Sequence, residues 1–480
     1  MKKWLCLLCA SVLGLSIFLS ACVTSVEPDA PTKDSIETAE PTTPEPTEKP
    51  TEAPTEEPTE PAPAGPTTFS KWFRDNALIG RIPALITKSS LYGEVLDVGD
   101  KWYQLDIHNT TLEDYWAYLD LLQENGYDLF VSNGENGLDN AVFSTTLTKG
   151  DDVVTVCFMT KMETVYVTAK EGAPLSPFLF YNADDVAKNA PGAVNKLTMR
   201  ELVNFGNGFV FQLKNNHFIV WDNGIEKDAY YLVDYLESCV PAGEKPIIDA
   251  IMISHDHSDH GGFLNAFIVS ETLPTRIIVN GLYYNWPSER VVAATNSDRA
   301  LLQTINMMRF VLRDEQGNSP KMYRPMAGQQ YYFNDVEFDV VWSQEYIPYE
   351  SQTGDMNDTS THFYVLADGQ RFLTGGDGES GEMTKLMQVY SKEYLKPDLY
   401  QILHHGYNTW NVYTDWIGDW SDVVCIDSAP IMRTANAANQ YLKDRCAEWI
   451  NWGDGSVVIT FPYKVGSYVR LPKIDLTQYY

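Results

Sequence analysis

The chain has 480 residues, is 44% hydrophobic and carries a formal net charge of −30 at pH 7. This length allows two or three domains. The acidic balance, without a basic cluster beyond the first residues, argues against a protein that binds long DNA or RNA tightly.

Residues 1–21 have the pattern of a lipoprotein signal peptide. A positive head precedes an apolar run at 4–19, which is shorter than the roughly 20 residues of a membrane-spanning helix. The segment Leu19-Ser20-Ala21-Cys22 resembles the bacterial lipobox, which implies cleavage before Cys22 and a lipid on its sulfur. We therefore expect a protein on the extracellular face of the bacterial cell membrane, attached only by this anchor. The alternative is an ordinary signal peptide with a chance cysteine.

Residues 22–66 are expected to hold the anchor and a disordered linker. The segment is dominated by Pro, Thr and Glu, so it cannot bury a core and predicts an extended spacer. The four cysteines beyond it show no CxxC spacing, which argues against a cysteine metal site. A Cys425–Cys446 disulfide and four free thiols are both left open.

Residues 67–185 are expected to form a small α+β domain of unknown role. Thr111 to Asp114 resembles a capping box, and an amphipathic helical pattern follows it as far as Asn125-Gly126. The strand patterns lie at 102–107, 128–132, 142–148, 153–159 and 164–169.

Residues 190–480 are expected to form a layered α/β domain, because strand and helix patterns mix along the segment. The strand patterns are 209–213, 217–221, 250–254, 276–280, 336–342, 362–367, 371–374, 399–403, 423–426 and 456–460. The helical patterns are 232–239, 299–312, 381–389 and 437–449.

One motif indicates metal chemistry. A buried-strand pattern at 251–254 runs directly into His255-Asp256-His257-Ser258-Asp259-His260-Gly261-Gly262. Two imidazoles two residues apart can bind one metal ion, and the neighbouring aspartate and histidine can reach a second. Nitrogen and carboxylate ligands together suit zinc, manganese or iron. Five of the eight histidines lie here or in the His404-His405 doublet, so chance clustering is a poor explanation.

This HxHxDH signature resembles the metallo-β-lactamase superfamily, over residues 195–465. Further matching segments follow in order: Phe218 to Gly224 with Asp222 beneath the site, Phe372 to Asp377, and Leu399 to Gly406. The resemblance implies an αββα sandwich. The stretch Asn357-Asp358-Thr359-Ser360 is similar to the branch of ComEC-type and teichoic acid phosphorylcholine esterase-like hydrolases.

The chain departs from that branch at Asn204, where the branch carries an acid. No histidine lies between 260 and 362, which matches the branch and argues against β-lactam hydrolysis. His362 could substitute as a ligand, although a packed strand position is the favoured interpretation.

The resemblance implies two divalent metal ions, with zinc favoured and manganese the alternative. The first metal is assigned to His255, His257 and Asp377. The second is assigned to Asp259, His260, Asp377 and His405.

Three residues receive candidate catalytic roles. Asp259 can orient the attacking hydroxide, and His404 can donate a proton to the leaving oxygen. Asn357 can contact a phosphoryl oxygen. A supporting role for His404 and a loop-capping role for Asn357 are the alternatives.

The favoured function is a cell-surface metal-dependent phosphodiesterase acting on a small molecule or a wall polymer. A nuclease-like phosphodiesterase, a lactonase or thioesterase, and a non-catalytic metal-containing binding lipoprotein are the alternatives. Aromatic residues at 281–286 and Trp410 could cage a choline ammonium, although core packing is favoured. The sequence does not indicate the oligomeric state.

Overall fold

The computed structural model describes residues 66–295, 299–343, 356–407, 411–433 and 436–475. Residues 65–480 form one compact unit. The predicted signal peptide, the Cys22 anchor, nearly all of the predicted linker and Trp410 lie outside the described residues. No described helix is long and apolar enough to cross a membrane. The four cysteines of the described segments are free thiols.

The first part of the unit is a six-stranded antiparallel sheet with the order β1-β2-β6-β5-β4-β3. Its strands are β1 (Leu91–Asp97), β2 (Tyr103–His108), β3 (Asp128–Ser132), β4 (Val142–Lys149), β5 (Asp152–Met159) and β6 (Thr164–Glu171). The predicted helix is confirmed as α3 (Leu112–Glu124), with the Thr111–Asp114 capping box formed. It packs on the sheet because Tyr115, Tyr118 and Leu122 recur on one face and are all buried. The short helices before it are η1 (Phe69–Lys71) and α2 (Ala77–Arg81).

Two larger sheets follow. The nine-stranded sheet has the order β13-β12-β10-β9-β8-β7-β21-β22, with β11 beside β10. Its strands are β7 (Lys196–Met199), β8 (Phe209–Gln212), β9 (Phe218–Trp221), β10 (Ile247–Ile253), β11 (Ile278–Val279), β12 (Gly281–Tyr284), β13 (Lys321–Tyr323), β21 (Val457–Thr460) and β22 (Val469–Arg470). The seven-stranded sheet contains β14 (Gln330–Phe333), β15 (Val336–Trp342), β16 (His362–Ala367), β17 (Gln370–Thr374), β18 (Leu399–Ile402), β19 (Val424–Asp427) and β20 (Glu448–Asn451), in that order.

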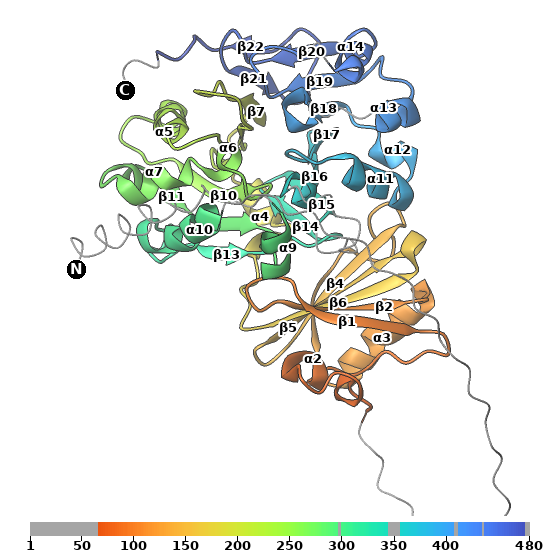
Figure 1. Cartoon of the computed structure of the whole chain (residues 1–480). Helices are drawn as coiled ribbons and strands as arrows, with labels where there is room; N and C mark the ends of the chain where they lie inside the picture. The colour runs from red at the N-terminus through yellow and green to blue at the C-terminus, as the bar shows by residue number, and fades with distance from the viewer. Residues whose placement is uncertain (1–65, 296–298, 344–355, 408–410, 434–435, 476–480) are drawn as a thin grey trace, which may run out of the picture. The chain divides into compact units, whose positions relative to one another are not determined.

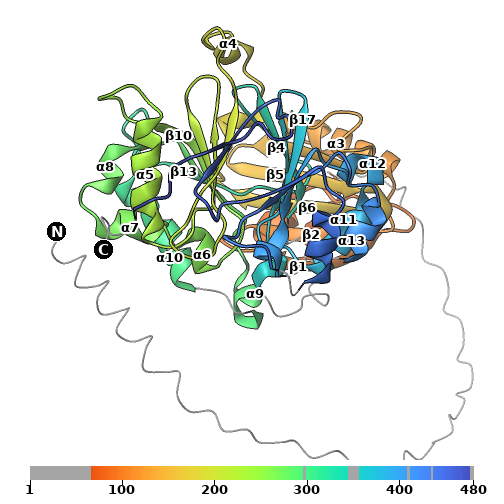
Figure 2. The same cartoon turned by 90° about the horizontal axis from the view of Figure 1, so that it is seen from above.

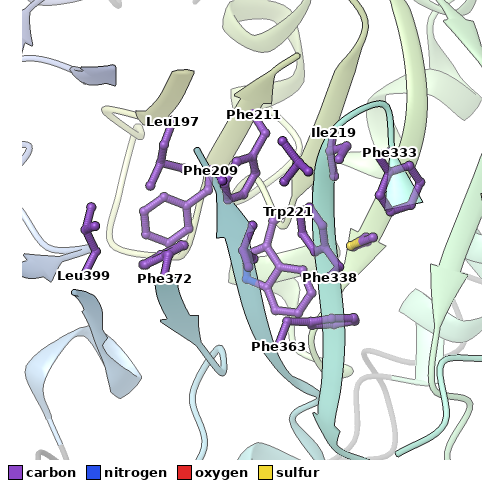
Figure 3. Close-up of a cluster of buried hydrophobic side chains, with 14 of the residues drawn as sticks. Leu197, Phe209, Phe211, Ile219, Trp221, Phe333, Phe338, Phe363, Phe372 and Leu399 are labelled. Atoms are coloured by element: carbon purple, nitrogen blue, oxygen red, sulfur yellow. The ribbon is translucent and has the colours of Figure 1, made fainter. Parts of the chain in front are cut away.

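An aromatic core joins these two sheets (Figure 3). The ring of Trp221 on β9 lies edge-on to Phe363 on β16, with 4.8 Å between ring centroids. Phe211 on β8 meets Phe338 on β15 in the same manner at 5.3 Å. Because both strands of each pair present alternate side chains to this interior, the sheets pack face to face.

Helices cover the outer faces of both sheets (Figures 1 and 2). Those on the nine-stranded sheet include α5 (Asp228–Ser238), α7 (Leu264–Val269) and α10 (Arg299–Val311). Those on the seven-stranded sheet include α11 (Ser380–Val389), α13 (Asn411–Ile417) and α14 (Ala437–Lys443). The shorter helices are α4 (Ala183–Val186), α6 (Ser258–Gly261), α8 (Leu273–Arg276), α9 (Glu289–Ala294), α12 (Lys392–Leu395), η2 (Thr160–Met162), η3 (Pro177–Leu179), η6 (Met356–Thr359) and η7 (Leu403–Gly406). The mixed α/β class is therefore confirmed, and the layers run helix, sheet, sheet, helix.

One predicted helix is wrong in part. The helical pattern at 437–449 ends at Lys443, and Glu448–Asn451 is strand β20, paired in parallel with β19. The pairing supplies backbone hydrogen bonds that local periodicity does not report. For the same reason the sequence patterns missed the short strands β7, β12, β13, β14 and β22, together with β1.

Candidate metal centre

The predicted ligands gather where strands of both large sheets end. The segment 255–260 directly follows β10, Asp377 follows β17, and His405 follows β18. Strands β17 and β18 are parallel neighbours, so their carboxyl ends lie at the same edge. The sheet packing brings this edge against the end of β10.

Four of the predicted ligands form a compact group. Asp259, His260, Asp377 and His405 each offer one ligand atom, and these atoms lie within 4.8 Å of one another. His260 Nε2 is 3.1 Å from Asp377 Oδ1. His405 Nε2 is 3.2 Å from Asp377 Oδ2 and 3.5 Å from Asp259 Oδ2. The residues assigned to the second metal are thus brought together.

The hydrogen bonding of this group fits a metal ion. His260 Nε2, Asp377 Oδ1 and His405 Nε2 are buried and have no hydrogen-bond partner within the described residues. They contact one another as ion pairs, but not in hydrogen-bonding geometry. A cation between them would satisfy all three, and two imidazoles with two carboxylates form a suitable ligand set for zinc. The group can therefore hold metal ions.

His255 and His257 form a neighbouring pair. His255 Nε2 lies 3.0 Å from His257 Nδ1, and the ring centroid of His255 lies 4.2 Å from that of His260. Among the described residues, neither His255 nor His257 belongs to the compact group that contains Asp377. Their assignment with Asp377 to the first metal stays a prediction.

The electrostatics of the cluster favour positive charge beside Asp377. Burial by itself would lower the pKa of His405, but Asp377 and Asp259 raise that pKa to about 9. Burial likewise opposes charging of His260, yet Asp377 and nearby carboxylates raise its pKa well above the usual range. Burial would raise the pKa of Asp377, but His260 and His405 hold it well below its usual range. A bound metal would take the place of these protons.

Asp222 supports the metal-ligand loop from beneath. Its Oδ1 accepts from the Ser254 amide at 2.8 Å. Its Oδ2 accepts from Ser254 Oγ at 2.8 Å, Asn207 Nδ2 at 3.0 Å and His260 Nδ1 at 2.8 Å. The bond to Nδ1 turns His260 Nε2 toward Asp377, as a carboxylate behind a ligating histidine usually does.

Gln401 on β18 is a supporting residue that sequence reasoning missed. Its Nε2 donates to the Gly376 carbonyl at 2.9 Å, and its Oε1 accepts from the amides of Gly375 and Gly376 at 3.1 and 3.2 Å. These bonds hold the turn that presents Asp377. A lone glutamine in an otherwise apolar buried strand was the available signal.

His404 and Asn357 also lie beside Asp377. His404 Nε2 is 3.7 Å from Asp377 Oδ2 and 3.4 Å from Asn357 Nδ2. Sequence reasoning missed Glu379, whose Oε1 lies 3.2 Å from His404 Nδ1. His404 adopts a positive φ of 50°, a backbone conformation that is uncommon for histidine and concentrates at functional sites. The catalytic roles of Asn357 and His404 stay predictions.

The remaining candidates are buried side chains. His362 Nε2 has no hydrogen-bond partner among the described residues, so the packing role of His362 stays a prediction. His362 is fully buried with Nδ1 3.2 Å from the Ser360 carbonyl, and burial lowers its pKa to about 4. Tyr283, Tyr284 and Trp286 are all buried within the hydrophobic clusters. The aromatic segment 281–286 therefore packs as core.

Comparison with known proteins finds distant similarity to solved structures. No family model matches the chain, and no curated protein matches it. A metallo-β-lactamase from Hirschia baltica matches with a TM-score of 0.22 and 14% identity, over 38% of this chain and 67% of that chain. A protein of unknown function from Enterococcus faecalis V583 matches with a TM-score of 0.26 and 14% identity, over 44% of this chain and 49% of that chain. At this distance neither similarity bears on function.

Proposed function

We propose that this protein is a metal-dependent hydrolase of the metallo-β-lactamase type, and that its substrate is a phosphodiester. The observation that carries the proposal is the convergence of buried ligand atoms from His260, Asp377 and His405, which lie 3.1 to 3.2 Å apart without forming hydrogen bonds of good geometry. A purely structural metal site is usually closed by its protein ligands. Here Asp259 and His257 are only partly buried, so the centre reaches the surface.

The chain supplies the groups that a hydrolytic reaction needs. Two divalent ions, zinc first and manganese as the alternative, would supply Lewis acidity and make water nucleophilic near neutral pH. Asp259 orients the attacking oxygen from the surface side of the cluster. His404 donates a proton to the leaving oxygen, and Glu379 keeps the His404 ring turned toward Asp377.

The phosphodiester assignment rests on chemistry beside the metal ligands. The Asn357 amide lies next to His404, where it can donate a hydrogen bond to a non-bridging phosphoryl oxygen. The net charge of −30 argues against tight binding of long nucleic acid. We therefore propose a small-molecule or wall-polymer substrate, met on the extracellular face of the membrane through the Cys22 anchor.

The test is hydrolysis of bis(p-nitrophenyl) phosphate and p-nitrophenyl phosphorylcholine by the full chain loaded with zinc or manganese. Asp377→Ala should abolish turnover, while Asp120→Ala, at an exposed aspartate of α3, should leave it unchanged. Activity on the phosphorylcholine ester alone would select a head-group substrate. Metal bound at the cluster without turnover of either ester would refute the phosphodiesterase and turn the search to lactones, thioesters and a non-catalytic role.

A further inference from the structure

We propose a second, separate site for a divalent transition-metal ion, formed by His217, Asp249 and Glu315 with Asn280 beside them. Each of the first three residues offers one ligand atom, and these atoms lie within 4.8 Å of one another. The site is independent of the proposed hydrolase centre and goes beyond that function.

The site lies at the opposite end of the nine-stranded sheet from the hydrolase centre. His217 immediately precedes β9, Asp249 lies near the start of β10, and Asn280 immediately precedes β12. These three strands are parallel, so the residues share one edge. The hydrolase ligands follow the other end of β10, about 20 Å along the strand at roughly 3.3 Å per residue.

The ligand atoms are already gathered. His217 Nδ1 lies 3.0 and 3.1 Å from the two oxygens of Asp249. One amide nitrogen, Asn280 Nδ2, donates to Asp249 Oδ1 at 2.9 Å and to Glu315 Oε2 at 2.8 Å. The two carboxylates therefore meet around the Asn280 amide, with the imidazole beside Asp249. Neighbouring strands hold the backbones at His217 and Asp249, and Glu315 lies in the turn between α10 and β13.

The charge of Asp249 supports a cation. Its side chain is 4% exposed, and no lysine or arginine in the described segments forms an ion pair with it. Burying a carboxylate is costly unless a positive group lies beside it. The partner present is His217: burial opposes charging of its imidazole, but Asp249 raises its pKa, so a divalent ion would bind in place of that proton. A divalent ion bound to the neutral imidazole would neutralise both carboxylates.

A cavity gives the ion access and an open coordination position. The His217, Asp249 and Glu315 side chains line a cavity of about 990 Å³. This is near the upper end of the usual range of small-molecule sites. Three lysines line the cavity, Lys188, Lys214 and Lys321, and the first two are already paired with aspartates. Three protein ligands with one open side are typical of metal sites that exchange a water or bind a ligand.

The donor set indicates which ion to use as a probe. Imidazole nitrogen with carboxylate oxygen suits zinc and manganese better than calcium or magnesium, which take oxygen ligands. Zinc is therefore the probe. Aromatic rings including Phe130, Phe178 and Tyr332 line the same cavity, so an organic ligand could approach the ion from that side.

The experiment is zinc titration of the full chain by calorimetry, with bound zinc counted by mass spectrometry after dialysis. Glu315→Gln and His217→Ala should each remove one zinc equivalent or lower the affinity for that zinc at least about tenfold. Neither should change the zinc bound at the hydrolase centre. Glu271→Gln, at another exposed glutamate, is the matched control. Asp377→Ala should show the reverse pattern, losing hydrolase-centre zinc alone.

Glu315 is exposed, so Glu315→Gln should keep the fold, and an unchanged thermal midpoint checks this. Equal zinc content and affinity in the wild type, Glu315→Gln and His217→Ala would overturn the second site. That outcome leaves the proposed hydrolase intact. If Asp377→Ala loses activity but keeps the zinc at the second site, the second site is independent of the hydrolase centre.

Discussion

Substituting Asp222 by Asn tests whether the metal centre depends on the support beneath it. Asp222 is fully buried and adopts a φ of +49°, which asparagine also tolerates. The four donors around it come from Ser254 (amide and hydroxyl), Asn207 and His260. An amide can keep its oxygen toward three of them, but its NH2 group then faces the Ser254 amide.

One buried donor loses its acceptor, and the three remaining hydrogen bonds lose their charge assistance. The lost acceptor costs about 1–3 kcal/mol and the lost charge assistance adds to it, so we expect the free energy of unfolding to fall by roughly 2–4 kcal/mol. The imidazole of His260 also loses its charged partner, which should weaken zinc binding by about 10–100-fold.

Urea unfolding of the zinc-free protein measures the loss of stability, and competition against a chelator measures the loss of zinc affinity. Asp120→Asn, on the exposed face of α3, is the matched control. If the free energy of unfolding of Asp222→Asn lies within about 0.5 kcal/mol of the wild type and zinc binds equally well, the supporting role of Asp222 is refuted.

Three further substitutions address the surroundings of the site and the sheet behind it. Gly206→Ala should weaken zinc binding, because a Cβ there would lie 2.5 Å from the Asp259 carbonyl oxygen; Gly192→Ala, also at positive φ but in open space, should not. Gln401→Leu should lower the free energy of unfolding by about 2–4 kcal/mol, since two backbone amides lose their acceptor; unchanged urea unfolding would contradict this. Burial, with a neighbouring aspartate, raises the pKa of Glu337 to about 8, so the folded chain keeps a proton that the unfolded chain releases near pH 4.5. Wild-type stability should therefore fall as pH rises from about 4.5 to about 8. Glu337→Gln should flatten that part of a plot of the unfolding midpoint against pH. Equal slopes in the wild type and the variant would contradict the raised pKa of Glu337.

Local patterns were sufficient where the signal lies within a few residues. The capping box at Thr111 and the spacing of apolar residues after it predicted α3 closely. The buried pattern before His255 predicted the end of β10. These features depend on neighbouring residues, so the sequence carries them directly.

The sequence could not show which partners those residues meet. Gln401 and Glu379 gave no motif, and their roles arise only when β17 and β18 end beside each other. The pattern at 437–449 looked helical, but pairing with β19 turned its end into a strand.

The cluster of His217, Asp249 and Glu315 shows the same division most clearly. These residues are scattered over 99 positions of the chain, 217 to 315, and no spacing connects them. Parallel strands β9 and β10 bring His217 and Asp249 together, and hydrogen bonds to Asn280 hold Glu315 beside them from the turn after α10. The sequence by itself determined the local elements and the placement of the HxHxDH segment after β10, because those depend on short-range geometry. Only the tertiary structure decided the supporting contacts and the second site, because long-range strand pairing creates them.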